Sequence, residues 1–457
     1  MEVEIIPDTG IYEKDVKKFK LVRKDNGETH YYVTLKNNGG RCPICGKFTT
    51  KCKELKVKRI ILAEKKIIHY SARRLKCECN KTFYEDNPFI KDEKVLSDNA
   101  IKLILKELKR YNHTFLEVAQ RFNISVTKVI EIFDCHVQIK RKSLREVISV
   151  DEFYFSRRSK NKYAFMILGL NGEILDILKS RKKAKLLDYF KYIPLSERDR
   201  VKYVTMDMND IYKDVINRRF KDVTICIDSF HVIKMMNDEL EKLRKKLTRK
   251  YENNKKSNEY YLLKHKNYVL YKEELNENYH HSKHFHYLVN DLDYLNMILK
   301  IDDKLTNTYQ EIRRYYYFNK YWYEYTKDEI LDYLSNYIDE LFLSNNEYLI
   351  NIASTLNNWK KEIANSFISY ARNNGETTRL SNGRIEGKNS YIKKMLNLAN
   401  GYSNFERFRN RAMYCENLYE THSVDKLPNK VKRIFPKKKT TVWSGLHCLF
   451  AINPMII

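Results

Sequence analysis

Residues 147–155, VISVDEFYF, decide the fold. They have the mainly apolar composition of a buried strand, yet they place Asp151 in its interior. Residues 203–209, YVTMDMN, repeat this arrangement, with Asp207 at the end of a second apolar run. Burying a carboxylate is costly unless something pairs with it, so both positions indicate a functional site. Side chains alternate along a strand, so Asp151 and Glu152 point to opposite faces. We expect Asp151 to be the functional acid and Glu152 a bystander.

The residues around these two runs alternate between strand-like and helix-like segments. Strand candidates come first, and a strand-helix-strand alternation follows, which predicts an α/β domain with a mixed central sheet. The expected strands are residues 147–155, 163–170, 174–178, 201–206 and 223–227, and the expected helices are residues 184–192 and 211–220.

A third acid is expected on a later helix, in residues 383–394, GRIEGKNSYIKK. At helical spacing, one face of this helix carries Glu386, Asn389 or Ser390, and Lys393. Carboxylates bind hard divalent cations through oxygen, and two such ions about 4 Å apart can activate an attacking oxygen and stabilise a leaving one. The three acids therefore predict a site for Mg²⁺ (or Mn²⁺) that acts on phosphodiesters.

The charge of the chain favours a polyanionic partner. Its 457 residues include 86 lysines and arginines against 59 acidic residues, which leaves a net charge of +27. Neutralising phosphates with basic side chains releases condensed counterions, and the interleaved Tyr and Phe residues can stack on bases. Ribosomal and basic secreted proteins share such a composition, so charge alone does not identify nucleic acid as the partner.

Several classes of protein do not fit this sequence. It has no apolar run near the roughly 20 residues of a membrane span, and its first residues, MEVEII, do not resemble a signal peptide. It also has no GxxxxGK[ST] loop for ATP and no Ser/His or Cys/His signature of a covalent intermediate. We therefore expect a cytoplasmic, nucleoid-associated protein that uses neither membrane nor ATP.

Four of the nine cysteines form two tight pairs, Cys42 with Cys45 and Cys77 with Cys79. Two such pairs can supply the four thiolates of a tetrahedral zinc site, with Gly46 in a turn that needs a positive φ. The second pair has one intervening residue rather than two, so Cys52 or His69 could replace one member. We expect structural zinc, because four protein ligands leave no position for a reactive water; reduced structural cysteines are the alternative.

Residues 114–136 carry the signals of two short helices joined by a tight turn. Thr114 and Glu117 form a capping box, and Asn123 tolerates the left-handed conformation of a turn. The pair matches a DNA-reading helix-turn-helix, although an ordinary helical hairpin shows the same signals. The buried side of the second helix is expected to carry Val126, Val129, Ile130 and Phe133. The expected DNA-binding residues are Ser125, Thr127, Lys128, Lys140, Arg141 and Lys142.

The remaining segments complete the expected domain organisation. Residues 232–370 have helical periodicity and almost no Gly or Pro, which predicts a helical insertion. Its histidines at 280–286 resemble metal ligands, but their Lys- and Tyr-rich surroundings favour a solvated cluster. The expected domains are a zinc-binding domain (1–92), a helix-turn-helix (93–146), a catalytic core in two parts (147–240 and 371–420), the insertion between them (241–370), and a C-terminal tail without an assigned role (421–457).

Together these motifs resemble a known family, the insertion-sequence transposases of the "L three" type. The most specific matches are residues 225–232, ICIDSFHV, residues 381–387, SNGRIEG, and residues 400–411, NGYSNFERFRNR. The resemblance covers about residues 40–420. It implies a zinc-ribbon-like domain, a helix-turn-helix and a ribonuclease-H-like catalytic domain with a helical insertion.

The resemblance also assigns roles to individual residues. The three catalytic acids and magnesium ligands of the family fall on Asp151, Asp207 and Glu386, and its zinc ligands on Cys42, Cys45, Cys77 and Cys79. Asp228 and His231 belong to the family pattern, where Asp228 either tunes the metals or caps the next helix. The possible auxiliary residues are Asp228, His231, Arg384, Asn389 and Lys393.

The implied activity is a cut-and-join reaction on double-stranded DNA, at the terminal inverted repeats of a mobile element and in its target. Because two element ends must be paired, a homodimer or larger assembly on DNA is expected. Two alternatives remain open at this level: a nuclease of the same fold that never joins strands, and a catalytically silent, transposase-derived regulator that binds DNA.

Overall fold

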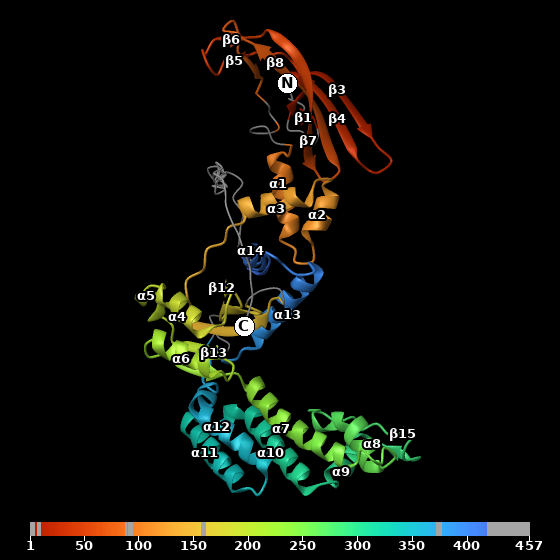
Figure 1. Cartoon of the computed structure of the whole chain (residues 1–457), viewed down its shortest axis with the longest axis vertical. Coiled ribbons are helices and arrows are strands. Elements are labelled where there is room, and N and C mark those ends of the chain that lie inside the picture. The colour runs from red at the N-terminus through yellow and green to blue at the C-terminus, as the bar shows by residue number, and fades with distance from the viewer. Residues whose placement is uncertain are drawn as a thin grey trace, which may run out of the picture.

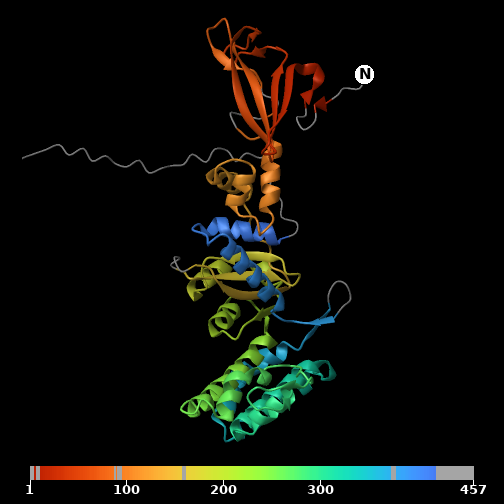
Figure 2. The same cartoon turned by 90° about the vertical axis from the view of Figure 1, so that its right-hand side faces the viewer.

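The computed structural model describes residues 5–6, 11–86, 89, 95–156, 161–371 and 377–417. The molecule is elongated, as Figures 1 and 2 show. A β-rich N-terminal module stands at one end, and a group of short helices connects it to a mixed α/β core. A helical body forms the other end. The tail expected at 421–457 lies outside the described residues.

The N-terminal module is built on a five-stranded sheet, larger than a minimal zinc ribbon. Its strand order is β3-β4-β8-β7, with β9 paired to β8, and β4 and β8 run parallel. Tyr31, Ile60, Ile68 and Tyr70 form part of its small buried core. The strands are β1 (Ile5–Ile6), β2 (Ile11–Tyr12), β3 (Val16–Arg23), β4 (Thr29–Leu35), β5 (Gly40–Arg41), β6 (Phe48–Thr49), β7 (Cys52–Ala63), β8 (Lys66–Lys76) and β9 (Thr82–Tyr84), with one 3-10 turn, η1 (Glu13–Asp15).

The two helices expected at 114–136 are present, and a further helix precedes them. Thr114 and Glu117 form the predicted capping box, and Asn123 has a φ of 49°. The predicted buried face is only partly correct: Val129 and Phe133 are buried, Val126 and Ile130 are partly buried, and Ile132, which was not predicted, is buried. Ile132 belongs to the apolar cluster that joins these helices to α14 of the core, so α3 is covered over a wider arc than one partner helix would give. The helices are α1 (Asp98–Leu108), α2 (Phe115–Arg121) and α3 (Val126–His136).

The expected mixed sheet is confirmed, with strand order β12-β11-β10-β13-β14. The first three strands pair antiparallel, and β10, β13 and β14 run parallel. One apolar cluster packs α4 and α6 on one face, and another packs α13 and α14 on the opposite face (Figure 1). The elements are β10 (Val147–Tyr154), β11 (Tyr163–Gly169), β12 (Ile174–Leu178), α4 (Lys183–Lys191), α5 (Leu195–Arg198), β13 (Tyr203–Met206), α6 (Asp210–Arg219), β14 (Thr224–Ile227), α13 (Gly383–Leu398) and α14 (Phe405–Glu416).

The segment between β14 and α13 is mostly helical, as its periodicity predicted, and it also contains the short strand pairs β15-β16 and β17-β18. Its first helix begins at Ser229 and runs without interruption past residue 240, and its apolar residues share one cluster with the sheet. The Asn365 amide donates to the carbonyl of Ile225 at 3.0 Å, which ties the last long helix to β14. The elements are α7 (Ser229–Lys250), α8 (Asn258–His265), η2 (Asn267–Leu270), β15 (His280–His281), β16 (Leu288–Val289), α9 (Asp291–Leu299), α10 (Asp303–Lys320), η3 (Trp322–Glu324), α11 (Lys327–Leu343), α12 (Glu347–Asn365), β17 (Ser369–Ala371) and β18 (Thr377–Arg379).

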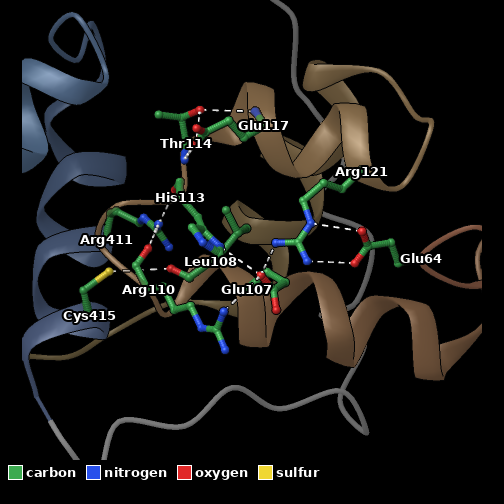
Figure 3. A network of polar contacts seen from close by, with 10 residues as sticks. All are labelled: Glu64, Glu107, Leu108, Arg110, His113, Thr114, Glu117, Arg121, Arg411 and Cys415. Atoms are coloured by element: carbon green, nitrogen blue, oxygen red, sulfur yellow. Dashed lines mark hydrogen bonds and ion pairs between the residues drawn. The ribbon is translucent and has the colours of Figure 1, made fainter.

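Two arginines join the N-terminal module, the short helices and the core (Figure 3). Arg121 on α2 donates to Glu64, which follows β7, at 2.8 Å and to Glu107 on α1 at 2.6 Å. Arg411 on α14 is 1% exposed and donates to the carbonyls of Arg110 and His113 at 2.9 and 2.7 Å. Within the residues described, no helix is long and apolar enough to cross a membrane.

Candidate active site

Asp151, Asp207 and Asp228 lie side by side, in or directly after three neighbouring strands of the central sheet. The pairing of the parallel strands β10, β13 and β14 aligns them. Ser149 pairs with Thr205, so two residues further along Asp151 comes opposite Asp207. Met206 pairs with Ile227, which places Asp228 beside Asp207 in the same way. The carboxyl ends of parallel strands are where sites of α/β proteins assemble. The pairing therefore brings both sequence-predicted aspartates to one edge and adds Asp228 to them.

Asp151 and Glu152 point to opposite faces, as alternation along β10 predicted. Asp151 is 8% exposed and faces α13, where Asn389 donates its amide N–H to Oδ2 of Asp151. Glu152 instead accepts hydrogen bonds from Arg181 and from the hydroxyl of Tyr212. Its carboxylate is therefore paired on the face opposite Asp151, although its charge still helps to raise the pKa of Asp151.

His231 connects the acids of the strands with the acid of the helix. It lies in the first turn of α7, and its Nε2 is 2.8 Å from Oδ1 of Asp207 and 3.4 Å from Oε1 of Glu386. Ligand atoms of Asp228, His231 and Glu386 all lie within 4.8 Å of one another, close enough to hold a metal ion. Of the three predicted acids, this metal-holding group contains only Glu386; Asp207 is connected to it through His231.

Asp228 is the most deeply buried acid of the group, at 3% exposed. It occupies the N-cap position of α7, but its side chain makes no hydrogen bond to the described residues of the first turn. Of the two roles expected for Asp228, capping the helix is therefore not the one observed. Its Oδ2 is buried and receives no hydrogen bond from any described residue. Burial raises the pKa of Asp228, opposed by a hydrogen bond from the backbone N–H of Asn382. An unsatisfied carboxylate oxygen of this kind fits a cation.

Only some of the predicted residues on α13 face the acidic site. Glu386 is partly exposed beside His231, and Asn389 contacts Asp151, so both face the site. Lys393 and Ser390 are exposed. The guanidinium of Arg384 donates to the carbonyl of Leu170, outside the acidic group.

A buried hydroxyl-amide chain supports Asp207, and sequence reasoning missed it. The hydroxyls of Ser149 and Thr205 are 2.6 Å apart, and Thr205 donates to Oδ1 of Asn382 at 2.5 Å. The amide N–H of Asn382 then donates to Asp207 at 3.3 Å. Polar residues inside the two apolar strands were the available signal, but nothing in the sequence paired them with Asn382, which is far along the chain.

Burial, with a smaller contribution from neighbouring charges, shifts the pKa values of these acids. Burial raises the pKa of Asp151 to about 7, and the negative charge of Asp207 adds to this effect. Burial also raises the pKa of Glu386, reinforced by the charge of Asp228. Burial alone would lower the pKa of His231, but its hydrogen bond to Asp207 and the surrounding carboxylates raise it instead. Such an excess of negative charge favours binding of cations.

Residues 148–412, from the start of β10 to α14, match the family model of the "L three" insertion-sequence transposases, described as a transposase. The match spans more than half of the chain and includes all five residues of the acidic site. The chain belongs to this transposase family. Among curated proteins, none matches the chain significantly. Membership indicates a transposase function in general.

The four cysteines of the predicted zinc site come together at the β5–β6 end of the N-terminal module. The Sγ atoms of Cys42 and Cys79 are 3.6 Å apart, and those of Cys45 and Cys77 are 3.4 Å apart. The backbone N–H of Cys45 lowers the pKa of Cys42 to about 6, against burial, which favours the thiolate that metals bind, whereas the pKa of Cys77 in the same group is raised. Gly46 has the positive φ, 71°, expected in this turn. The group could hold a zinc ion.

The two alternative zinc ligands lie outside this group. Cys52 donates to the carbonyl of Glu54. Nε2 of His69 is 2.7 Å from Nδ1 of His30, and its ring stacks on Tyr32. The shorter spacing of the second cysteine pair is therefore accommodated without a substitute ligand.

The predicted DNA-binding residues divide into two groups. Thr127, Lys128 and Lys140 are exposed, and the exposed Ser125 caps α3. Arg141 instead makes two hydrogen bonds to Glu197, at 2.6 and 3.0 Å, and Lys142 contacts Glu173 at 2.7 Å. A DNA contact by either of these two would compete with an internal ion pair. For the first group, contact with DNA stays a prediction.

Arg141→Ala is expected to lower the free energy of unfolding by about 1–3 kcal/mol, because the largely buried Glu197 would lose its charged partner. Lys140→Ala is expected to change it by less than about 0.5 kcal/mol, because that side chain is exposed. Urea unfolding compares the two variants, and DNA-binding titrations should show the opposite order, with the larger loss for Lys140→Ala. Equal stability losses would contradict the structural role given to Arg141.

Proposed function

We propose that this protein is a DNA transposase with a ribonuclease-H-like core, in which Asp151, Asp207 and Glu386 hold two divalent ions, Mg²⁺ or Mn²⁺. The observation that carries the proposal is the strand register, which sets Asp151 opposite Asp207; His231, which contacts Asp207, also contacts Glu386 of α13. Membership of the transposase family supports the same reading.

The residues at this edge fit divalent cations. They supply oxygen ligands, which Mg²⁺ prefers, and one buried oxygen of Asp228 has no hydrogen-bond partner among the described residues. Burial is the main cause of the raised pKa values of Asp151 and Glu386, and the charges of Asp207 and Asp228 add to it. Ions bound there would activate the attacking oxygen and stabilise the leaving oxygen.

The surrounding side chains would fix the geometry of the acids. Asn389 holds Asp151 through its amide, and the chain from Ser149 to Asn382 holds Asp207. His231 lies between Asp207 and Glu386 and balances part of their charge. The reaction would consist of hydrolysis at the end of the element, which frees a 3′-hydroxyl, and attack of that hydroxyl on target DNA.

The modules outside the core would bind DNA. The helix-turn-helix and the zinc-holding module would recognise terminal inverted repeats, and the insertion would brace a second DNA segment. Pairing two ends requires a homodimer or a larger assembly on double-stranded DNA. The protein would act in the cytoplasm, on the DNA of the nucleoid, without ATP.

The test is to incubate the purified protein with Mg²⁺ and the DNA that flanks its own gene, beside Asp207→Ala. We expect strand cuts with 3′-hydroxyl ends and joined products, both absent in the variant. Cleavage without joining would replace the proposal by a nuclease of the same fold. DNA binding without cleavage would replace it by a silent regulator.

A further inference from the structure

An aromatic pocket of about 490 Å³ lies between α10 and α11 of the insertion. Six of its nine lining residues are aromatic, five tyrosines and Phe318, and the other three are polar or charged. Its volume falls within the range of small-molecule sites, about 300–1,000 Å³. The acidic site described above does not use it.

Several rings of this pocket lie in nearly parallel pairs, whereas the ring of Tyr325 is inclined to those of Phe318 and Tyr333. Phe318 stacks on Tyr333 with ring centroids 3.9 Å apart and an angle of 14°. Tyr317 and Tyr321 lie 6.2 Å apart at 12°, and they are 59% and 36% exposed. Flat aromatic faces open to solvent are the platforms on which nucleobases stack, whatever the base.

The rim of the pocket supplies both hydrogen-bond donors and acceptors. The exposed Asn336 has an amide that can do both, Arg314 donates, and Glu340 accepts. Arg314 pairs with Glu340 and lies over the ring of Tyr337 at 4.7 Å. The edge of a base can satisfy such groups, whereas an apolar side chain would cover them without a partner.

One side of the pocket, at Phe318, lies next to Phe367 and close to Arg379 of β18. Asn319, next to the pocket residue Phe318, accepts a hydrogen bond from Arg379 at 2.7 Å. The guanidinium of Arg379 lies 3.7 Å from the ring centroid of Phe367, which in turn packs on Phe318. The charge of Arg379 also acts on Asp228. A short chain of side chains therefore connects the pocket to the acids.

We propose that this pocket receives one unpaired nucleobase of DNA bound at the acidic site. The inference rests on the proposed function for the presence of DNA, but it concerns a separate binding site. The base stacks on the exposed faces of Tyr317 and Tyr321, and its edge bonds with Asn336 or Glu340. Extruding a base from a duplex costs a few kcal/mol, so DNA that already carries an unpaired base binds more tightly.

The experiment compares a paired duplex with the same duplex carrying one extra, unpaired 2-aminopurine, in buffer without added Mg²⁺. Fluorescence anisotropy gives the two affinities, and quenching of 2-aminopurine reports stacking on a ring. Wild type is expected to prefer the bulged duplex by roughly 10-fold, with quenching. Tyr317→Ala and Tyr321→Ala should lose both effects, whereas Tyr321→Phe, which keeps the ring, should retain them.

Tyr279→Ala is the matched control, because Tyr279 is a 64% exposed tyrosine elsewhere in the same segment. It should behave as wild type, and circular dichroism should show that all variants fold. Equal binding of the two duplexes by wild type would overturn the pocket proposal and leave the transposase reaction intact. Failure to bind either duplex would overturn both. Loss of self-association in the pocket variants, with an unchanged preference for the bulge, would reassign the pocket as an interface between copies.

Discussion

Replacing Asp151 by asparagine is expected to reduce metal-dependent strand cleavage by at least about 10³-fold, because a ligand of the ions that carry the developing charge is lost. Binding of DNA should persist, since Asp151 is buried beneath Asn389 and away from the helix-turn-helix. Thermal stability without divalent ions should not fall, because asparagine is neutral and removes a buried charge. Cleavage assays with Mg²⁺, DNA-binding titrations and thermal unfolding measure the three effects.

The adjacent acid provides the matched control. Glu152→Gln changes the same chemical group on the same strand, but on the face that holds Arg181 and Tyr212. Glutamine keeps an acceptor for those donors, so we expect cleavage within a few-fold of wild type and a stability loss of about 1 kcal/mol. If Glu152→Gln abolished cleavage and Asp151→Asn did not, the assignment of strand faces would have to be reversed.

The core strands could be predicted because they are short, apolar and regularly spaced. Residues 174–178 were expected as a strand and form β12 with the same bounds. The acids at 151 and 207 stood out because their apolar surroundings make a charge costly. Their alignment opposite each other could not be predicted, because it depends on the parallel register of β10 and β13, which local periodicity does not encode.

The part of the site that escaped prediction depends on contacts between distant segments. Asn382 lies 175 residues from Asp207 and contributes through a side chain that is common in loops. Arg141 and Lys142 were read as DNA contacts because the local run is basic, yet their partners Glu197 and Glu173 come from later in the chain. A basic run predicts charge, but not which of its members is already paired.

In the N-terminal module, too, local motifs could be predicted from the sequence, whereas the pairing of distant strands could not. Its cysteines were recognisable by spacing, and the capping box and turn that follow were recognisable by residue type. The parallel pairing of β4 with β8 was not expected, because parallel neighbours need a long connection and give no hairpin signal. The sheet is consequently larger than the small zinc-holding unit that the cysteine pairs suggested.

The β5–β6 end of this module has little apolar material to hold it together. Ile44 and Phe48 are 70% and 58% exposed, and the buried apolar core of the module lies in other strands. Structural zinc in small domains contributes about 10–16 kcal/mol of apparent binding free energy, which becomes folding free energy. Metal–thiolate bonds are therefore the interaction expected to order this end of the sheet.

Cys45→Ser is accordingly expected to abolish zinc binding and to unfold the β5–β6 end, which would weaken binding to the ends of the element. Zinc content by atomic absorption and limited proteolysis within residues 40–80 measure the two effects. Cys52→Ser is the matched control, because Cys52 is exposed and lies outside the thiol group. The catalytic core has its own apolar cluster and should keep its protease resistance in both variants. If the wild-type protein contained no zinc and Cys45→Ser remained resistant, the four thiols would be reduced structural cysteines, and the strands alone would hold the module in order.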